Sequence, residues 1–396
     1  MTLDAISPVT RQRIYLDHAA SGGPIDDAVV DAMAAYMRHH AASHGRGTYR
    51  SATDAASIVD QLRTRLATRL NAPSLRCIGL LPGCTVALNV AIAGLIRPGD
   101  RVITTAADHH AVLRPLMAMR NDEHSRIDVT IVPVDASGRV DANEVLAAVQ
   151  GPGDWIVMTA ASNVTGVIQP VDRIANGRPK GVGLICDAAQ TFGWFSHDVD
   201  RGAIDAWIAP AHKACGGPMG IAAMCLHPRH FGTLRPTILG GTGSGGTASA
   251  MPSSYPEKIE AGNLNVAAAV GWYVALDRWD VADSDRLKRA ATMRNRLVES
   301  IRSAGFQTPE SSPTRNDLPV VAFWHPEIGA AELATIFDVE YGIELRAGHH
   351  CASAVHPHLS APETGVVRVS AGPHTSDGTI DAFRRAVQQI GEAFSP

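Results

Sequence analysis

The sequence predicts an α/β protein with a large domain built on a mostly parallel β-sheet and a smaller α+β domain after it. Short apolar runs alternate with helical stretches from residue 75 to 227. Runs of this kind, bounded by Gly, Pro or Asp, are typical of strands buried on both faces, and intervening helices favour parallel pairing. A segment rich in Gly, Ser, Thr and Pro, residues 236–256, then ends the alternation and indicates a long functional loop.

The predicted strands of the large domain share apolar composition and short length. In chain order they are Cys77–Leu81, Arg101–Thr105, Val129–Val132, Trp155–Thr159, Gly183–Cys186, Ala206–Ala209 and Ile221–Leu226.

The remainder of the chain has a different pattern. A helix-rich stretch covers Val266–Ala290, a short apolar run covers Leu318–Phe323, and a C-terminal helix is expected around Ile380–Phe394. We therefore expect a large domain at 15–262 and a small domain at 263–396, with residues 1–14 packing on the small domain.

Composition narrows the function classes. The chain has 396 residues, 45% of them hydrophobic, and a formal net charge of −4 without a basic run, so nucleic acid is not an expected partner. No apolar stretch reaches the length that crosses a bilayer, and the first residues do not resemble a signal peptide. The six cysteines form no CxxC pair, which favours reduced thiols in a cytoplasmic protein.

Two strand ends carry the strongest chemical signal. Lys213 follows one apolar run and is preceded by His212, while Asp187 ends an earlier run. Ligands of such sheets bind beyond the carboxyl ends of the strands, so these side chains are expected in one pocket. A lysine that forms a Schiff base and an aspartate that keeps a pyridine nitrogen protonated are what pyridoxal phosphate requires.

Other strand ends could complete this pocket. The turn before Cys84 and Thr85 enters a helix whose N-terminus favours a phosphate, although an ordinary capped turn fits as well. His109 could stack on a cofactor ring, or be a surface or core histidine. Asn163 and Gln190 could contact substrate or cofactor, or cap loops.

Arg346 and Cys351 form the second strong feature. A thiol in a Gly-containing loop among an arginine and two histidines has nearby positive charge that favours the thiolate, so Cys351 is a candidate nucleophile, with a buried structural cysteine as the alternative. Arg368 lies in an otherwise apolar strand, where a substrate carboxylate or an internal salt bridge would satisfy it. Histidines occur in adjacent pairs at 39–40, 109–110 and 349–350, but no further ligands lie at the spacing of a metal site, so no metal site is expected.

Together these motifs resemble the class V aminotransferase family of pyridoxal phosphate enzymes, of fold type I. The nearest branch is the group II cysteine desulfurases and selenocysteine lyases. The resemblance covers nearly the whole chain, and its segments are Ile14–Ser21, His44–Gly47, Asp108–Ala111, Ser162–Gly166, Asp187–Gln190, His212–Lys213, Gly240–Ser244, Glu260–Gly262, Arg346–Ala352 and Arg368–Ser370.

The resemblance implies a seven-stranded sheet and a role for each matching residue. Lys213 would carry the cofactor and move protons, and Cys351 would take sulfur from L-cysteine as a persulfide and release L-alanine. Arg368, Asn163 and Arg346 would bind the substrate. The implied cofactor contacts are Asp187, Gln190, His109, Thr85, His212, Asn163 and the positions of two family threonines, Cys84 and Asn263.

The resemblance also implies a homodimer in which the Glu260–Asn265 segment reaches the partner's site, and a sulfur acceptor, a protein or small thiol, that contacts the 351–364 loop. This chain departs from the family pattern at several positions, which are Cys84, Ala160, Pro210, Asn263 and His374. These differences keep two alternatives open. One is a pyridoxal phosphate β-lyase, epimerase or aminotransferase for a specialised amino acid, and the other is a retired enzyme fold that binds partners.

Overall fold

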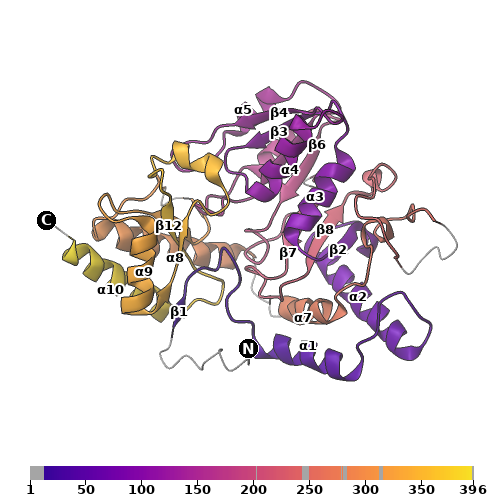
Figure 1. Ribbon diagram of the computed structural model, residues 1–396, viewed down its shortest axis with the longest axis horizontal. Coiled ribbons are helices and arrows are strands. Elements are labelled where there is room, and N and C mark those ends of the chain that lie inside the picture. The colour runs from indigo at the N-terminus through magenta and orange to yellow at the C-terminus, as the bar shows by residue number, and fades with distance from the viewer. Residues whose placement is uncertain are drawn as a thin grey trace.

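The computed structural model describes residues 13–201, 203–242, 249–277, 279, 283–311 and 315–394. A large α/β unit lies beside a smaller α+β unit, which Figure 1 shows in orange and yellow. Within the described ranges, no helix has the length and apolar character to cross a membrane.

The core of the large unit is a seven-stranded sheet in the order β2-β8-β7-β6-β5-β3-β4. Strand β8 runs antiparallel to both of its neighbours, and the other pairs are parallel. Each predicted run forms a strand, so the predicted fold class is confirmed. The strands are β2 (Ile78–Leu81), β3 (Arg101–Thr105), β4 (Asp128–Val132), β5 (Trp155–Thr159), β6 (Gly183–Asp187), β7 (Ala206–Pro210) and β8 (Ala222–Leu226).

Strands β2 and β5 to β8 are buried along their full length, which explains their continuous apolar sequence. Edge strand β4 is only partly buried, with Val129 and Val132 as its buried residues. The helices of this unit are α1 (Asp27–His39), α2 (Arg50–Arg69), α3 (Cys84–Leu95), α4 (His110–Asn121), α5 (Ala142–Ala148) and α6 (Val171–Gly177).

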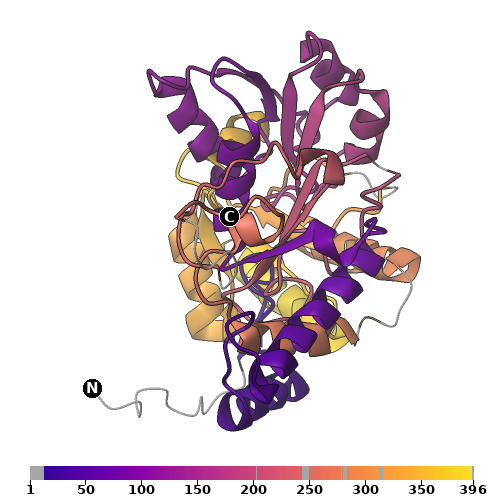
Figure 2. The same ribbon diagram turned by 90° about the vertical axis from the view of Figure 1, so that its right-hand side faces the viewer.

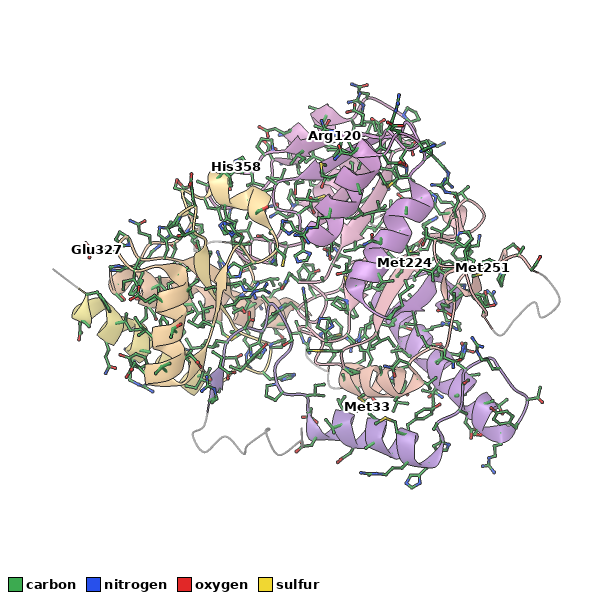
Figure 3. All side chains as sticks on the ribbon, viewed as in Figure 1. Met33, Arg120, Met224, Met251, Glu327 and His358 are labelled. Carbon is green, nitrogen blue, oxygen red and sulfur yellow. The ribbon has the colours of Figure 1, made fainter. Side chains whose placement is uncertain are left out.

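Helix α7 (Val266–Asp277), which follows the predicted domain boundary, packs against α1 and α2 of the large unit. Figures 1 and 2 show the indigo α1 and the orange α7 together at the foot of the molecule. Met33 of α1 lies beneath α7 in Figure 3, and a Cβ on Gly271 would come within 2.7 Å of its Sδ. The glycine thus permits the close approach of the two helices.

The small unit has a three-stranded antiparallel sheet in the order β11-β12-β9, with its own apolar core. The N-terminal strand β1 (Ile14–Tyr15) pairs with β10 (Ile343–Glu344) of this unit, while residues 1–12 lie outside the described residues. Its remaining elements are α8 (Asp283–Ser303), β9 (Val320–Phe323), α9 (Ala330–Tyr341), β11 (Arg346–Gly348), the 3₁₀ helix η5 (Ser353–His358), β12 (Val366–Ser370) and α10 (Asp377–Ala393).

The predicted loop at 236–256 contains no helix or strand in its described parts, 236–242 and 249–256. Residues 243–248, which include part of the glycine-rich motif, lie outside the described residues. Arg46 links this loop to the segment that follows it, because its Nη2 donates to the carbonyls of Gly241 (3.0 Å) and Gly262 (2.9 Å).

Candidate active site

A cavity of about 320 Å³ lies at the carboxyl edge of the large sheet, where the small unit meets it. Most of the predicted site residues line it. They are Cys84, Thr85, His109, Asn163, Asp187, Gln190, His212, Lys213, Arg346 and Arg368. Cys351 lies outside this lining as an exposed residue, in contact with Arg346. Asn263 is also exposed and does not line the cavity.

Asp187 and Lys213 both line the cavity, and the charge of each affects the pKa of the other. Asp187 ends β6, and its Oδ1 accepts a hydrogen bond from Ala189 N at 2.9 Å. Burial raises the pKa of Asp187, and the charge of Lys213 and that hydrogen bond oppose the rise. Burial lowers the pKa of Lys213, and Asp187 opposes that fall. A lysine whose pKa is depressed reaches the neutral, nucleophilic amine more easily.

The N-terminus of α3 provides a place for an anion. Gly83 is its N-cap, and Gly83, Cys84 and Thr85 all line the cavity, so the N-terminus of the helix borders open space. The buried Nδ1 of His212 has no hydrogen-bond partner among the described residues. Burial, then the charge of Lys213, lowers the pKa of His212 to about 4, so the ring is neutral. Burial also raises the pKa of the Cys84 thiol well above its usual range.

His109 is held in one orientation at the N-terminus of α4. Its Nδ1 accepts a hydrogen bond from Ala111 N at 3.0 Å, which places the ring proton on Nε2. Burial is the main reason that the pKa of His109 falls to about 4, and Lys213 adds to it. The cavity therefore contains a neutral, flat imidazole with a fixed tautomer.

Arg368 and Asn163 offer unused hydrogen-bonding atoms to a ligand. The Arg368 guanidinium bonds to the Asn163 carbonyl (3.0 Å) and to the Asp17 carboxylate, and its Nε has no partner within the described chain. Asn163 Nδ2 donates to the His350 carbonyl at 2.7 Å, while its buried Oδ1 has no such partner. Burial lowers the pKa of Arg368, and Asp17 opposes this effect. A free donor beside a free acceptor fits a small zwitterion.

Cys351 is held at a strained backbone position next to the cavity. Both His350 (φ 52°) and Cys351 (φ 57°) are left-handed, which costs non-glycine residues about 1–2 kcal/mol each. Arg346 Nη2 lies 3.6 Å from Cys351 Sγ. The predicted loop after Cys351 begins with η5, whose end is marked by His358 in Figure 3. Val355 and Leu359 are buried beneath it, so this segment is packed rather than open.

Gln190 has a second role that the sequence does not show. Its Nε2 donates to the carbonyl of Ala19 at 3.0 Å, so it holds the N-terminal segment at the cavity wall. Sequence reasoning also missed Asp17, His110 and His350 as individual residues. These residues lie in the segments Ile14–Ser21, Asp108–Ala111 and Arg346–Ala352, but their contacts with distant parts of the chain are visible only in the folded structure.

The cavity residues fit pyridoxal phosphate. The helix N-terminus at the cavity and His212 Nδ1, which has no partner among the described residues, suit a phosphate. The half-buried Lys213 suits the aldehyde, and Asp187 suits a pyridine nitrogen. Among the described residues, no group of three His, Cys, Asp or Glu side chains is arranged to hold a metal ion.

Fold and site together define an α/β enzyme with a lysine and an aspartate at the carboxyl edge of its sheet. The chain belongs to the aminotransferase class-V family, whose profile matches residues 14–383. This confirms the assignment made from the motifs.

Its relatives include proteins named as cysteine desulfurases. A probable cysteine desulfurase of Methanothermobacter thermautotrophicus is 29% identical, with 97% of this chain and 96% of the relative aligned. The cysteine desulfurase CsdA of Escherichia coli is 28% identical over 96% of this chain and 94% of its own length.

Solved structures that resemble this chain also include cysteine desulfurases. A structure of E. coli CsdA with an S-sulfonic acid matches with a TM-score of 0.81 at 26% identity, covering 97% and 96% of the two chains. The apo cysteine desulfurase of Thermococcus onnurineus matches with a TM-score of 0.87 over 96% and 95%, and at 24% identity it supports the fold.

Proposed function

We propose that this chain is a pyridoxal phosphate-dependent, cysteine desulfurase-like enzyme that converts L-cysteine to L-alanine and carries the released sulfur as a persulfide on Cys351. The observation that carries the proposal is the position of Cys351. It is the exposed thiol of the described chain, and it contacts Arg346, whose side chain lines the cavity that contains Lys213 and Asp187. Relatives named as cysteine desulfurases align over nearly the full length.

When bound, pyridoxal phosphate supplies the electron sink that lets an amino acid lose its α-proton. Asp187 would pair with the pyridine nitrogen, and His109 would stack on the ring. Thr85, His212 and the N-terminus of α3 would hold the phosphate, with Cys84 beside them. Gln190 would contact the phenolic oxygen.

Substrate would be held by its carboxylate and processed by two groups. Arg368 Nε, a donor without a partner among the described residues, would bind the substrate carboxylate, and Asn163 Oδ1, an acceptor without such a partner, would face the amino group. Lys213 would move the proton at the α-carbon. The Cys351 thiolate would attack the cysteine sulfur, the Cβ–S bond would break, and L-alanine would leave after proton return, so that Cys351 keeps one sulfur atom as persulfide.

We also propose a cytoplasmic homodimer that passes sulfur to a protein or small-thiol acceptor at the segment around η5. Asn263 is exposed and does not line its own chain's cavity, which supports a role of the Glu260–Asn265 segment in the partner's site. All six cysteines are free thiols, which supports a reducing compartment. Sedimentation of the holoenzyme would test the dimer.

The direct test is formation of alanine and sulfide from L-cysteine, with a thiol reductant and cofactor-loaded protein. We expect equal amounts of both products, and loss of both in Cys351→Ser. Lys213→Ala should lack the absorbance band of lysine-bound cofactor. No alanine from the loaded wild-type protein, together with spectral changes on adding other amino acids, would favour a specialised lyase, epimerase or aminotransferase. Absence of cofactor binding altogether would favour the retired fold.

A further inference from the structure

We propose that His110 is a positioning residue for the sulfur-carrying thiol, because it fixes the backbone of Cys351 relative to the imidazole of His109 in the cavity. The inference rests on the proposed function, in which Cys351 accepts sulfur from a substrate bound beside His109.

The turn that carries these histidines is anchored by Asp108. This fully buried carboxylate accepts hydrogen bonds through Oδ2 from Thr104 Oγ1 (2.9 Å), Thr105 N (2.7 Å) and Thr105 Oγ1 (2.8 Å). Through Oδ1 it accepts one from Thr159 N at 2.5 Å. The donors end two neighbouring strands, β3 and β5. The turn after β3 is therefore tied to the sheet edge and cannot shift independently.

From this anchored turn, the two histidines serve different parts of the site. His109 lines the cavity. His110 instead contacts the thiol loop, through its backbone N–H to the Cys351 carbonyl (2.7 Å) and through Nε2 to Ser353 Oγ (3.0 Å). A single peptide bond thus joins the residue that faces the cavity to the residue that holds the nucleophile.

The thiol loop needs such external contacts to keep its conformation. His350 and Cys351 are consecutive left-handed residues without being glycine, a combination that persists only when surrounding groups hold it. The large unit contributes one hydrogen bond to each carbonyl, from Asn163 Nδ2 to His350 (2.7 Å) and from His110 N to Cys351. Loss of the second bond should allow the Cys351 peptide to relax and move the sulfur.

The fold allows this backbone bond to be removed without breaking the helix. His110 is the first residue of α4, a position at which proline is well accommodated. His109 has φ −69° and ψ 154°, the conformation that a following proline requires. His110→Pro therefore removes both the N–H and the imidazole, whereas His110→Ala removes only the imidazole.

A matched control exists at α1. Asp27 is exposed and is the first residue of that helix, and the preceding Asp26 has φ −60° and ψ 138°. Asp27→Pro also introduces a proline at the first position of a helix, but far along the chain from the thiol loop.

The primary experiment measures two properties of the cofactor-loaded variants. Hydrogen exchange with mass spectrometry reports on residues 349–358, and single-turnover labelling reports Cys351 persulfide formed from L-cysteine. In His110→Pro we expect exchange about tenfold faster or more in this segment. We expect persulfide formation to fall about 10- to 100-fold, as for a misplaced reacting group, and about threefold in His110→Ala. Cofactor affinity and the spectral response to L-alanine should stay within about twofold.

Several results would overturn the inference. Unchanged exchange in His110→Pro would show that His110 does not hold the loop, and faster exchange with normal persulfide formation would show that the loop position is not needed. Equal losses in cofactor affinity would show that His110 acts through the cofactor. If the wild-type protein forms no alanine, the proposed function fails, while the exchange measurement still decides whether His110 anchors Cys351.

A second pair of variants covers the case in which His110→Pro does not fold. Ser353→Ala removes the hydroxyl partner of the His110 imidazole but leaves the Ser353 N–H, which lies 3.5 Å from Nε2, so it should slow persulfide formation no more than His110→Ala does. The double variant should be no slower than His110→Ala, because that change already removes both contacts of the imidazole with Ser353. Additive losses would contradict the proposed contact.

Discussion

Arg346 and Arg368 lie directly opposite each other on the neighbouring strands β11 and β12, and both side chains line the same cavity. Like charges at opposed strand positions are normally destabilising. Here each guanidinium has its own partner, since Arg368 pairs with Asp17 and Arg346 contacts the Cys351 sulfur. The two guanidinium groups thus have separate partners, a carboxylate for Arg368 and a sulfur atom for Arg346.

Asp17→Asn tests the charge balance of Arg368. The arginine side chain is only 1% exposed, so loss of the Asp17 charge leaves a buried cation uncompensated. We expect the free energy of unfolding to fall by about 2–3 kcal/mol in urea titrations of the apoprotein. Asp128→Asn is the control, because it removes a more exposed pair with Arg101 and should cost less than about 1 kcal/mol. Equal costs would contradict a special role for Asp17.

The six thiols should differ sharply in their reaction with a disulfide reagent such as DTNB. Cys351 is exposed, Cys84 is partly buried, and the other four are buried. Burial raises the pKa of Cys215 to about 12 and that of Cys225 well above its usual range, which suppresses their thiolates. We expect one fast-reacting thiol in the native protein and all six in denaturant. Persistence of the fast phase in Cys351→Ser would show that another cysteine is accessible.

The sheet could be predicted because its strands are buried on both faces and so have continuous apolar sequences. The residues at strand ends could be predicted for a related reason, since the carboxyl ends of parallel strands meet at one edge. Lys213, Asp187 and His109 are therefore found together as expected, from strand ends far apart in the sequence.

Residues that act through tertiary hydrogen bonds could not be predicted in this way. The pairing of Asp17 with Arg368 depends on the position of the N-terminal segment, which bridges to Ser370 of β12. The contact of His110 with Cys351 joins residues more than 200 positions apart. The packing of α7 on α1 could not be predicted from the sequence either. Helix α7 is apolar around its whole circumference, so its residue pattern does not indicate which face contacts another helix.

The buried imidazoles of the cavity should make the apoprotein sensitive to acid. His109 and His212 both have a pKa lowered to about 4, chiefly by burial, from the ordinary value of 6.5. Between pH 6.5 and 4 these histidines bind protons in the unfolded chain but not in the folded protein. Their contribution to the free energy of unfolding is therefore fully present above pH 6.5 and is lost as the pH falls toward 4. In urea titrations from pH 7 to 4.5, His109→Gln or His212→Gln should each remove part of this slope, by up to about 1 kcal/mol per pH unit. His124, whose side chain is 94% exposed, is the control, and His124→Gln should change the slope less than either cavity variant. Parallel pH profiles for all three variants and the wild-type protein would show that the cavity imidazoles accept protons in the folded state.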